Sequence, residues 1–457
     1  MTYVFPVYDC YSLPLAKHLQ DEGNEVIIGM LASRNQMMIP GVKDDQKPED
    51  RKQRLSNYDG LLKKQSLPDM IHRLSMVRPE GRDNYFFFFD FNDLYKISEQ
   101  ILRMGFRKGL FPTERYYRLE KERKLSKKFA IENYPDVKVA EAFDFKSVAD
   151  GIKKIRESDQ IFCLKSNGNE GKTIVPATDE IDIAQDQLID ALQKGKKQYE
   201  KGGFMLEEKI PDCLEVTPIM VFWDGVPVYS IAEFENKQYG AGNIGAQKGG
   251  NQVVSIRTEL DAEINRIAFP EVIYNMAEQQ PGLSIYDAGL LYDGSDFWFT
   301  EFCAMRYGWD GIFSEIVMAD KGTPFVTEYF ESIMRGESPL VNKCGAAVRL
   351  FNYEGDYEDT KDPLGDEVMT WDDEIENNLF LYSAKKRGNE IVDTEDRDFV
   401  AAVTGAGDTV ESAVKAAYDR VDKFHFDKLY FRPMFDFLSK DYKDSIPNRI
   451  KAVEQFL

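Results

Sequence analysis

The stretch that decides the fold is IYDAGLLYDGSDFWFTEFCAMRYGWDG, residues 285–311. Two apolar runs, Ala288–Leu291 and Phe297–Phe302, flank the four residues Tyr292-Asp293-Gly294-Ser295. Short apolar runs separated by a turn of this composition are typical of a β-hairpin. We therefore predict two neighbouring strands, the second of which ends beside Glu301.

Glu301 and Arg306 give this hairpin a chemical interpretation. The carboxylate stands at the end of the second predicted strand, and the arginine follows in a bend that contains glycine. A carboxylate in this place can hold a divalent cation against phosphate oxygens, while a guanidinium neutralises their charge from the other side. A surface salt bridge is the commoner explanation of such a pair, so the residues that bind a nucleotide must be sought elsewhere in the chain.

Composition restricts the classes of function. The chain has 457 residues, of which 43% are hydrophobic, and this is enough for several compact units with buried cores. Its formal charge of −21 disfavours binding to nucleic acid or to an anionic membrane surface. The five cysteines form no CxxC pair and there are only three histidines, so neither a disulfide scaffold nor a histidine-rich zinc site is expected.

The first 30 residues contain no basic segment that leads into an apolar core, so no secretory signal is predicted. No apolar run in the chain approaches the roughly 18 residues that a membrane-spanning helix needs. We therefore expect a cytoplasmic protein in a reducing compartment, without a membrane partner.

The N-terminal region predicts a β-α-β unit of a Rossmann-like domain, with strands at Thr2–Val7 and Glu25–Met30 and a helix at Leu13–Glu22. Its first turn, residues 8–12, has no glycine, so the close backbone approach that a dinucleotide requires is not expected. A nicotinamide cofactor is therefore not predicted.

Three further segments have a clear pattern. Residues 34–84 are charged and punctuated by proline, which predicts an insertion or lid with one or two short helices; a solvated elaboration without a function of its own is the commoner explanation of such a segment. Residues 85–91, YFFFFDF, are interpreted as a central buried strand of the first sheet. Residues 117–132 predict a single basic helix, and residues 264–279 predict another helix before the hairpin.

A strand at Gln160–Lys165 runs directly into SNGNEGKT, residues 166–173. In such a loop, glycines let backbone N–H groups approach phosphate oxygens, and Lys165 and Lys172 supply positive charge. The loop is not a Walker motif, because Ser166 stands where the first glycine is required. An ordinary hairpin turn remains an equal alternative.

Carboxylates follow the next strand, Phe204–Leu206. Glu207 and Glu208 stand at its exit and Glu215 precedes the strand after it, so they can accept hydrogen bonds from an adenine amino group and ribose hydroxyls, or serve only as rim charges. Residues 239–250, YGAGNIGAQKGG, are predicted to form a mobile loop, either functional or merely flexible. Beyond residue 330 the pattern predicts a small α+β unit.

Taken in order, these segments resemble the ATP-grasp superfamily, and within it most closely the phosphoribosylamine–glycine ligases. The resemblance extends from about residue 117 to 435. It rests on the segments SKKFA (126–130), LKSNGNEGKT (164–173), MLEEKI (205–210), YGAGNIGAQKGG (239–250), DAGLLYDG (287–294), FTEFCAMRYGWDG (299–311), GAAVRLF (345–351) and AVTGAGDTVESAVKAAYDRV (402–421).

The resemblance implies an α/β and α+β multidomain fold. The expected parts are a Rossmann-like preATP-grasp domain at residues 1–115, with the insertion at about 34–84, an ATP-grasp domain at 116–335, whose small lobe covers about 135–205, and a C-terminal α+β domain at 336–457.

The resemblance also implies roles for single residues. Lys127 and Lys165 correspond to the two nucleotide lysines, and Gly171 and Lys172 to the loop over the γ-phosphate. Glu207, Glu208 and Ile210 correspond to the adenine hinge, and Glu215 to the ribose contact. Lys237 corresponds to a phosphate or substrate contact, Glu301 to the metal ligand, and Arg306 to the arginine that steadies the transferred phosphoryl group. The family has an asparagine two residues after the metal glutamate, where this chain has Cys303, so Asp287 or Asp310 is expected to supply the second ligand.

The implied activity is ATP-dependent ligation of a small-molecule acid and amine through an acyl phosphate, with Mg²⁺, or Mn²⁺ in its place, by a monomer or homodimer. The first turn, residues 8–12, lacks the glycines and arginine with which the family binds its phosphoribosyl amine in purine biosynthesis. We therefore expect a different amine. The alternatives are a true phosphoribosylamine–glycine ligase and an ATP-binding protein without catalytic activity.

Overall fold

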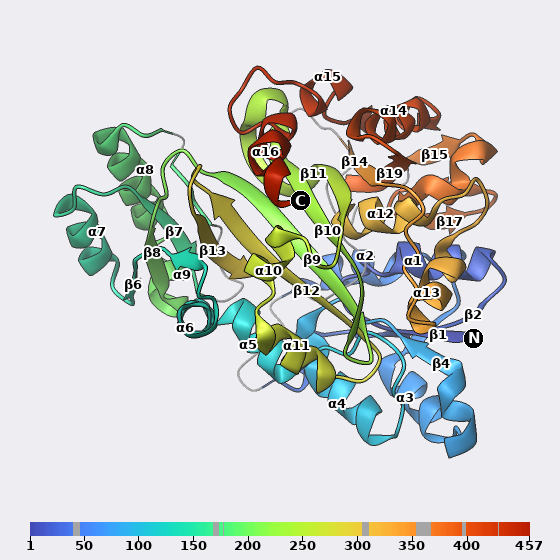
Figure 1. The fold of residues 1–457 in the computed structure, drawn as a ribbon. Coiled ribbons are helices and arrows are strands. Elements are labelled where there is room, and N and C mark those ends of the chain that lie inside the picture. Colours follow the sequence, from blue (N-terminus) through green and yellow to red (C-terminus); the bar gives the residue numbers. More distant parts are fainter. Residues whose placement is uncertain are drawn as a thin grey trace. The chain divides into compact units, whose positions relative to one another are not determined.

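The computed structural model describes residues 1–39, 46–167, 173–176, 178–303, 310–352, 367–394, 399–427 and 429–457 (Figure 1). The chain divides into two compact units. The large unit consists of Met1–Glu114, Thr217–Asp287 and Ala304–Leu457, and the small unit of Arg115–Val216 and Ala288–Cys303. None of the helices in the described ranges is long and apolar enough to cross a membrane.

The large unit begins with the predicted β-α-β arrangement. β1 (Thr2–Val7), α1 (Leu13–Asp21) and β2 (Glu25–Met30) are followed by β3 (Lys64–Ser66) and β4 (Tyr85–Phe87), and the four parallel strands lie in the order β3-β2-β1-β4. The expected central strand is therefore wrong in position, because β4 is last in this order. The segment is nevertheless buried, because Phe86 and Phe88 pack against the Phe330 ring. These aromatic contacts explain why residues 85–91 are apolar although the strand is not central.

Residues 34–84 contain two α-helices, as predicted, α2 (Pro48–Ser56) and α3 (Leu67–Ser75). The same segment also supplies β3, whose Lys64 pairs with Ile28 of β2. Part of this segment therefore belongs to the sheet. The helix α4 (Tyr95–Arg103) follows β4, and its apolar side chains Ile97 and Ile101 join the buried cluster around Phe87 and Met70.

A second sheet of the large unit is antiparallel. Its strands, in spatial order, are β16 (Leu379–Leu381), β19 (Phe399–Gly407), β14 (Cys344–Asn352), β11 (Ile244–Thr258), β10 (Val226–Gly240) and β9 (Leu214–Trp223). The helices α12 (Asp310–Ile316) and α14 (Val410–Val421) pack on this sheet. The remaining elements of the large unit are α10 (Glu263–Ala268), α11 (Glu271–Glu278), α13 (Val326–Met334), β15 (Val368–Trp371), β17 (Lys385–Arg387), β18 (Glu390–Val392), β20 (Phe424–His425), β21 (Leu429–Tyr430), α15 (Met434–Phe437) and α16 (Ile446–Val453).

The predicted mobile loop at residues 239–250 is a β-hairpin instead. Gln238 pairs with Gln247 and Gly240 pairs with Ile244, so the ladder of β10 and β11 continues almost to the tip. The glycines serve this geometry: Gly242 has a φ of 67°, in the left-handed region that glycine adopts without strain. The glycine-rich composition correctly indicates a turn, but pairing between the flanking strands β10 and β11 orders most of the segment.

Two predicted helices are each broken into two. Residues 117–132 form α5 (Glu114–Lys121) and α6 (Arg123–Asn133), separated at Glu122, whose φ of −97° and ψ of 83° are not helical. Residues 264–279 form α10 and α11, and Pro270 stands between them because its ring fits only the start of the second helix.

The small unit contains a three-stranded antiparallel sheet with the order β6-β8-β7. Its strands are β6 (Ala142–Phe145), β7 (Phe162–Ser166) and β8 (Phe204–Glu208), and α7 (Val148–Arg156), α8 (Ile181–Lys194) and α9 (Lys196–Gly202) accompany it. Phe162, Leu164, Phe204 and Leu206 belong to the core shared with the helices. Because side chains alternate along a strand, the intervening residues point to the opposite face.

The predicted hairpin at residues 288–302 is confirmed. β12 (Leu283–Tyr292) and β13 (Phe297–Phe302) are antiparallel, with Ala288 opposite Phe302 and Gly289 opposite Glu301. The short strand β5 (Val137–Val139) runs parallel to β13, and α6 packs against both. This arrangement places the first residues of α6 near the end of β13.

Candidate active site

The face of the β6-β8-β7 sheet that points away from the helices α7 and α8 carries the charged residues of the site. Lys165 on β7 is paired with Met205 of β8, and Glu207 is paired with Cys163, so all four side chains point away from the core. Lys165 Nζ donates to Glu207 Oε1 at 2.6 Å. The predicted phosphate lysine and the first hinge glutamate are therefore in direct contact.

Lys127 of α6 completes a buried triad. Its Nζ lies 2.6 Å from Glu207 Oε2 and donates to the Ala140 carbonyl at 3.3 Å. The exposed fractions of Lys127, Lys165 and Glu207 are 8%, 7% and 5%. Burial lowers the pKa of Lys127, and Glu207 opposes that shift. Two ammonium groups share one carboxylate, so this triad has an excess positive charge that an anionic ligand can neutralise.

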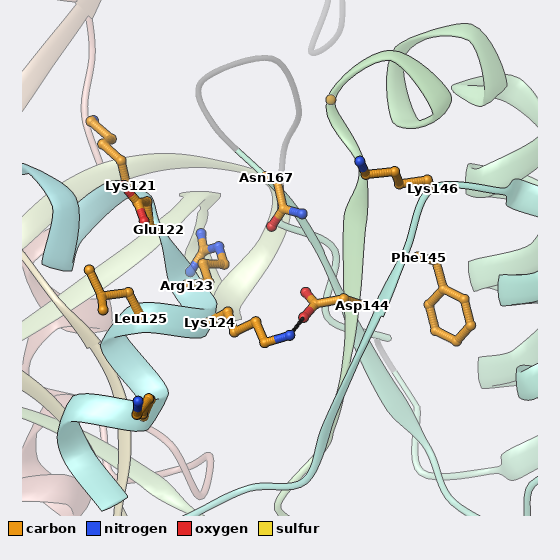
Figure 2. A pocket seen from close by; sticks show the side chains of 11 residues that line it. Lys121, Glu122, Arg123, Lys124, Leu125, Asp144, Phe145, Lys146 and Asn167 are labelled. Carbon is orange, nitrogen blue, oxygen red and sulfur yellow. Dashed lines mark ion pairs between the residues drawn. The ribbon is translucent and has the colours of Figure 1, made fainter. Parts of the chain in front are cut away.

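Two cavities lie along this face. One, of about 860 Å³, is lined by residues of α6, β6 and the strand before it, and by Met205. The other, of about 850 Å³, lies toward the end of the sheet at Phe145 and Asn167 (Figure 2). Both are of the size of ligand pockets. Their basic lining residues are Lys121, Arg123, Lys124, Lys127, Lys128 and Lys146, a concentration of positive charge in a chain of net charge −21.

Lys124 and Asp144 line both cavities. The Lys124 side chain extends from α6 toward Asp144 of β6, and its Nζ lies 3.9 Å from Asp144 Oδ2 (Figure 2). The Lys124 side chain is 85% exposed, so this ion pair is a weak bridge between the helix and the sheet. A ligand can therefore displace it at little cost.

The two adjacent glutamates predicted for the adenine hinge have different partners. Glu207 contacts the lysines, whereas Glu208, one residue later, accepts from Gln160 Nε2 at 3.3 Å. Strand alternation alone explains this difference. Ile210 is buried, and Glu215, at the start of β9, is half-buried.

Glu301 is paired with a residue that sequence reasoning missed. Arg123, the first residue of α6, places Nη1 2.9 Å from Glu301 Oε2, and its Nε donates to the Ser166 carbonyl at 3.4 Å. Its position four residues before Lys127, on the same face of a helix, was the one available signal. The predicted metal ligand therefore takes part in a salt bridge, the alternative that its sequence position also allowed.

Lys237 and Asp287, two site residues predicted in the large unit, lie near a group of glutamates. Lys237 Nζ is 3.0 Å from Glu235 Oε1 on the same strand. Burial, together with the charges of Glu235, Asp287 and Glu315, raises the pKa of Glu233, and Lys237 opposes that shift. Asp287 thus lies among carboxylates that sequence reasoning did not single out.

Glu315 of α12 is the most buried member of this group. It is fully buried and accepts hydrogen bonds from the hydroxyls of Tyr229 and Tyr329. Burial raises its pKa from 4.5 to about 7, although the two hydroxyls act in the opposite direction. Burial therefore favours the uncharged form of this carboxyl group.

Three predicted residues, Gly171, Lys172 and Arg306, lie outside the described residues. Within the described ranges, no group of three or more His, Cys, Asp or Glu side chains could hold a metal ion. Mg²⁺ usually keeps several waters and binds proteins through one or two carboxylates together with substrate phosphates. The carboxylate oxygens of Glu301 therefore suit a metal that arrives with a nucleotide better than a resident metal.

Comparison with known proteins gives the fold. No protein-family model matches the sequence, and no curated protein sequence matches it. Among solved structures, phosphoribosylamine–glycine ligase from Thermotoga maritima is similar, with a TM-score of 0.62 and 15% identity over 94% of this chain and 99% of that chain. Biotin carboxylase from Campylobacter jejuni, as a β-γ-ATP complex, has a TM-score of 0.59 and 13% identity over 94% of this chain and 92% of that one.

A third similar structure is the biotin carboxylase domain dimer of 2-oxoglutarate carboxylase from Hydrogenobacter thermophilus, in complex with MgADP, ADP and bicarbonate. Its TM-score is 0.57, with 13% identity over 100% of this chain and 98% of that chain. At these identities the likeness concerns the fold, and it extends over nearly the whole length of each protein.

Proposed function

We propose that this chain, which has the ATP-grasp fold, is an ATP-dependent ligase that joins a carboxylic acid to an amine and releases ADP and phosphate. The observation that carries the proposal is the buried triad Lys127–Glu207–Lys165, with its excess positive charge beside two basic cavities. A nucleotide triphosphate supplies the anion that this arrangement lacks.

The register of the sheet suggests how the nucleotide lies. Glu207 and Ile210 mark one end of the exposed face, where an adenine would sit, with Glu208 and Glu215 as further hinge and ribose candidates. Ser166 pairs with Phe204 at the other end of the sheet. We place the phosphates toward that end, next to Lys165, which follows the order of the residues along β7.

Glu301 is the residue that would hold Mg²⁺, or Mn²⁺ in its place, and Asp287 remains a second ligand proposed from the sequence. When bound, the ion would neutralise charge on the transferred phosphoryl group. Arg306, Gly171 and Lys172 remain proposed phosphate contacts from sequence, and Lys237 remains a proposed substrate contact.

The proposed reaction has two steps. A carboxylate oxygen of the acid attacks the γ-phosphorus, the bond to the β-γ bridging oxygen breaks, and ADP leaves. The amine nitrogen then attacks the acyl carbon, the bond from that carbon to the phosphate oxygen breaks, phosphate leaves with this oxygen of the original carboxylate, and the nitrogen loses a proton. Neither step needs a nucleophilic side chain, because phosphoryl transfer depends on position and charge neutralisation. Cys163, on the nucleotide face, stays a thiol, since burial raises its pKa to about 11.

The first turn of the large unit supports an altered amine. Asp90, which is fully buried, accepts from Tyr8 N at 3.1 Å and from Asp9 N at 2.9 Å. Backbone N–H groups at this point of a Rossmann-like unit commonly bind a ligand phosphate. Here the protein's own carboxylate takes that place, which favours an amine without a phosphoribosyl group over phosphoribosylamine.

The test is ADP release from Mg-ATP with a panel of amino acids and amines that includes glycine with phosphoribosylamine. The wild type is compared with Lys165→Met, Glu301→Gln and, as a surface control, Lys153→Met. We expect stimulation by one acid–amine pair, lost in the first two variants and kept in the third. ADP binding without stimulated turnover across the panel would instead favour a non-catalytic ATP-binding protein.

A further inference from the structure

Arg123 connects two segments that end at the site. Its guanidinium contacts Glu301 at the end of β13, 178 residues away in sequence, and the carbonyl of Ser166 at the end of β7. The Arg123 side chain is 21% exposed and that of Glu301 is 45% exposed. Arg123 also lines the cavity at the phosphate end of the sheet (Figure 2).

The salt bridge uses the carboxylate that is proposed to bind metal. Arg123 Nη1 lies 2.9 Å from Glu301 Oε2. Mg²⁺ requires its oxygen ligands at about 2.0–2.1 Å in octahedral geometry. A guanidinium and a divalent cation repel each other, so both cannot occupy the same side of one carboxylate without cost.

We infer that Arg123 is a positioning residue that competes with the divalent cation for Glu301. In the protein without nucleotide, the guanidinium neutralises the carboxylate and fixes its orientation. When metal and nucleotide enter together, the cation takes Glu301 and the guanidinium is left beside the phosphate-end cavity. The inference rests on the proposed function, because it assumes that the metal arrives with a nucleotide.

An arginine suits this role better than a lysine. Its planar guanidinium presents several N–H donors in fixed directions, so it holds the Ser166 carbonyl through Nε while Nη1 binds the carboxylate. After Glu301 is released, the Nε contact can keep the side chain in place. The remaining donors can then serve an anion in the cavity.

The test measures metal binding without turnover. Wild type, Arg123→Gln, Arg123→Lys and Lys153→Gln are titrated with Mn²⁺ in saturating ADP, and free Mn²⁺ is followed by electron paramagnetic resonance. Lys153→Gln is the control: it removes one positive charge from the same unit, but its side chain is 71% exposed, pairs with Glu157 at 3.9 Å and lines neither cavity.

We expect Arg123→Gln to tighten Mn²⁺ binding by about three- to fivefold, the upper part of the range for a partly exposed ion pair, while Lys153→Gln changes it by less than about twofold. Unchanged binding in Arg123→Gln, or an equal change in Lys153→Gln, would overturn the inference and leave the proposed function intact. If the wild type binds no ADP, the proposed function itself fails. The Mn²⁺ affinity of Arg123→Lys, which keeps the charge but loses the planar guanidinium, should fall between those of wild type and Arg123→Gln. If Arg123→Gln does not fold, Arg123→Lys tests the inference in its place.

Discussion

Lys127 and Lys165 bind the two oxygens of one buried carboxylate, each at 2.6 Å, although the first lies on a helix and the second on a strand. The carboxylate, Glu207, is all that separates two ammonium groups in a site with little access to water. A bound anion reduces the repulsion between these ammonium groups, so anion binding should change the stability of the protein.

Removing the carboxylate should therefore cost more stability than removing one lysine. Glu207→Gln leaves two buried cations and is expected to lower the free energy of unfolding by about 3–5 kcal/mol. Lys165→Met leaves a balanced pair with Lys127 and should cost less. Urea unfolding of both variants checks the order, and a larger loss in Lys165→Met would contradict it.

The same variants should respond differently to nucleotide. ADP at a hundred times its dissociation constant stabilises a binding-competent protein by about 2.7 kcal/mol. We expect ADP to stabilise the wild type. The affinity of Lys165→Met for ADP should be at least tenfold lower, since a charge-assisted hydrogen bond is lost. Isothermal titration calorimetry measures this, with Lys153→Met as a surface control that should bind normally.

Stability should fall as the pH rises through neutrality because of Glu315. Its pKa is about 7 in the folded protein and 4.5 when unperturbed. Between these values the folded state binds the proton and the unfolded state does not, so stability declines above about pH 4.5, and the loss is complete above about pH 7. The shift corresponds to about 3 kcal/mol.

Glu315→Gln should reduce this slope, because the amide oxygen still accepts from Tyr229 and Tyr329 but does not titrate. Burial also raises the pKa of Asp90 and of Glu233, so part of the slope remains in the variant. The variant is expected to be more stable than the wild type at pH 8.5 and to lose the advantage near pH 5. Thermal unfolding at both pH values gives the comparison, and parallel curves for the two proteins would show that Glu315 is not the titrating group.

Asp90→Ala should open the first turn to anions. The substitution frees the N–H groups of Tyr8 and Asp9 and should cost about 1–3 kcal/mol, because buried donors lose their acceptor. Inorganic phosphate should then stabilise the variant and leave the wild type unchanged. Thermal shifts in phosphate and in chloride of equal ionic strength test this, and an equal response of both proteins would refute it.

Asp436→Ala should release the tip of the β10–β11 hairpin. Asp436 Oδ1 accepts from Gly242 N at 2.7 Å, and the same carboxylate neutralises the fully buried Arg432. We expect a loss of about 3–5 kcal/mol and faster amide exchange at residues 239–250. The double variant with Arg432→Met should recover part of the stability, whereas additive losses would argue against a shared charge.

The sequence by itself determined the elements whose cause is local. Alternation and turn composition predicted the β12–β13 hairpin, the β1-α1-β2 opening and the strand that ends at Lys165, because side-chain period and turn chemistry act between near neighbours. Pro270 also divides two helices for a local reason, although the pattern of residues 264–279 predicted one continuous helix. The order of the motifs along the chain was enough to predict the ATP-grasp fold, which the structure and its solved relatives confirm.

Tertiary structure alone decided which charges meet. Glu301 contacts Arg123 across 178 residues, and Asp90 contacts Tyr8 across 82. No periodicity encodes such pairs, because they arise only when strand ends and helix starts are brought together. The ordered hairpin at residues 239–250 has the same origin, since long flanking strands and the carboxylate of Asp436 stabilise a glycine-rich tip that local propensity favours as a loop.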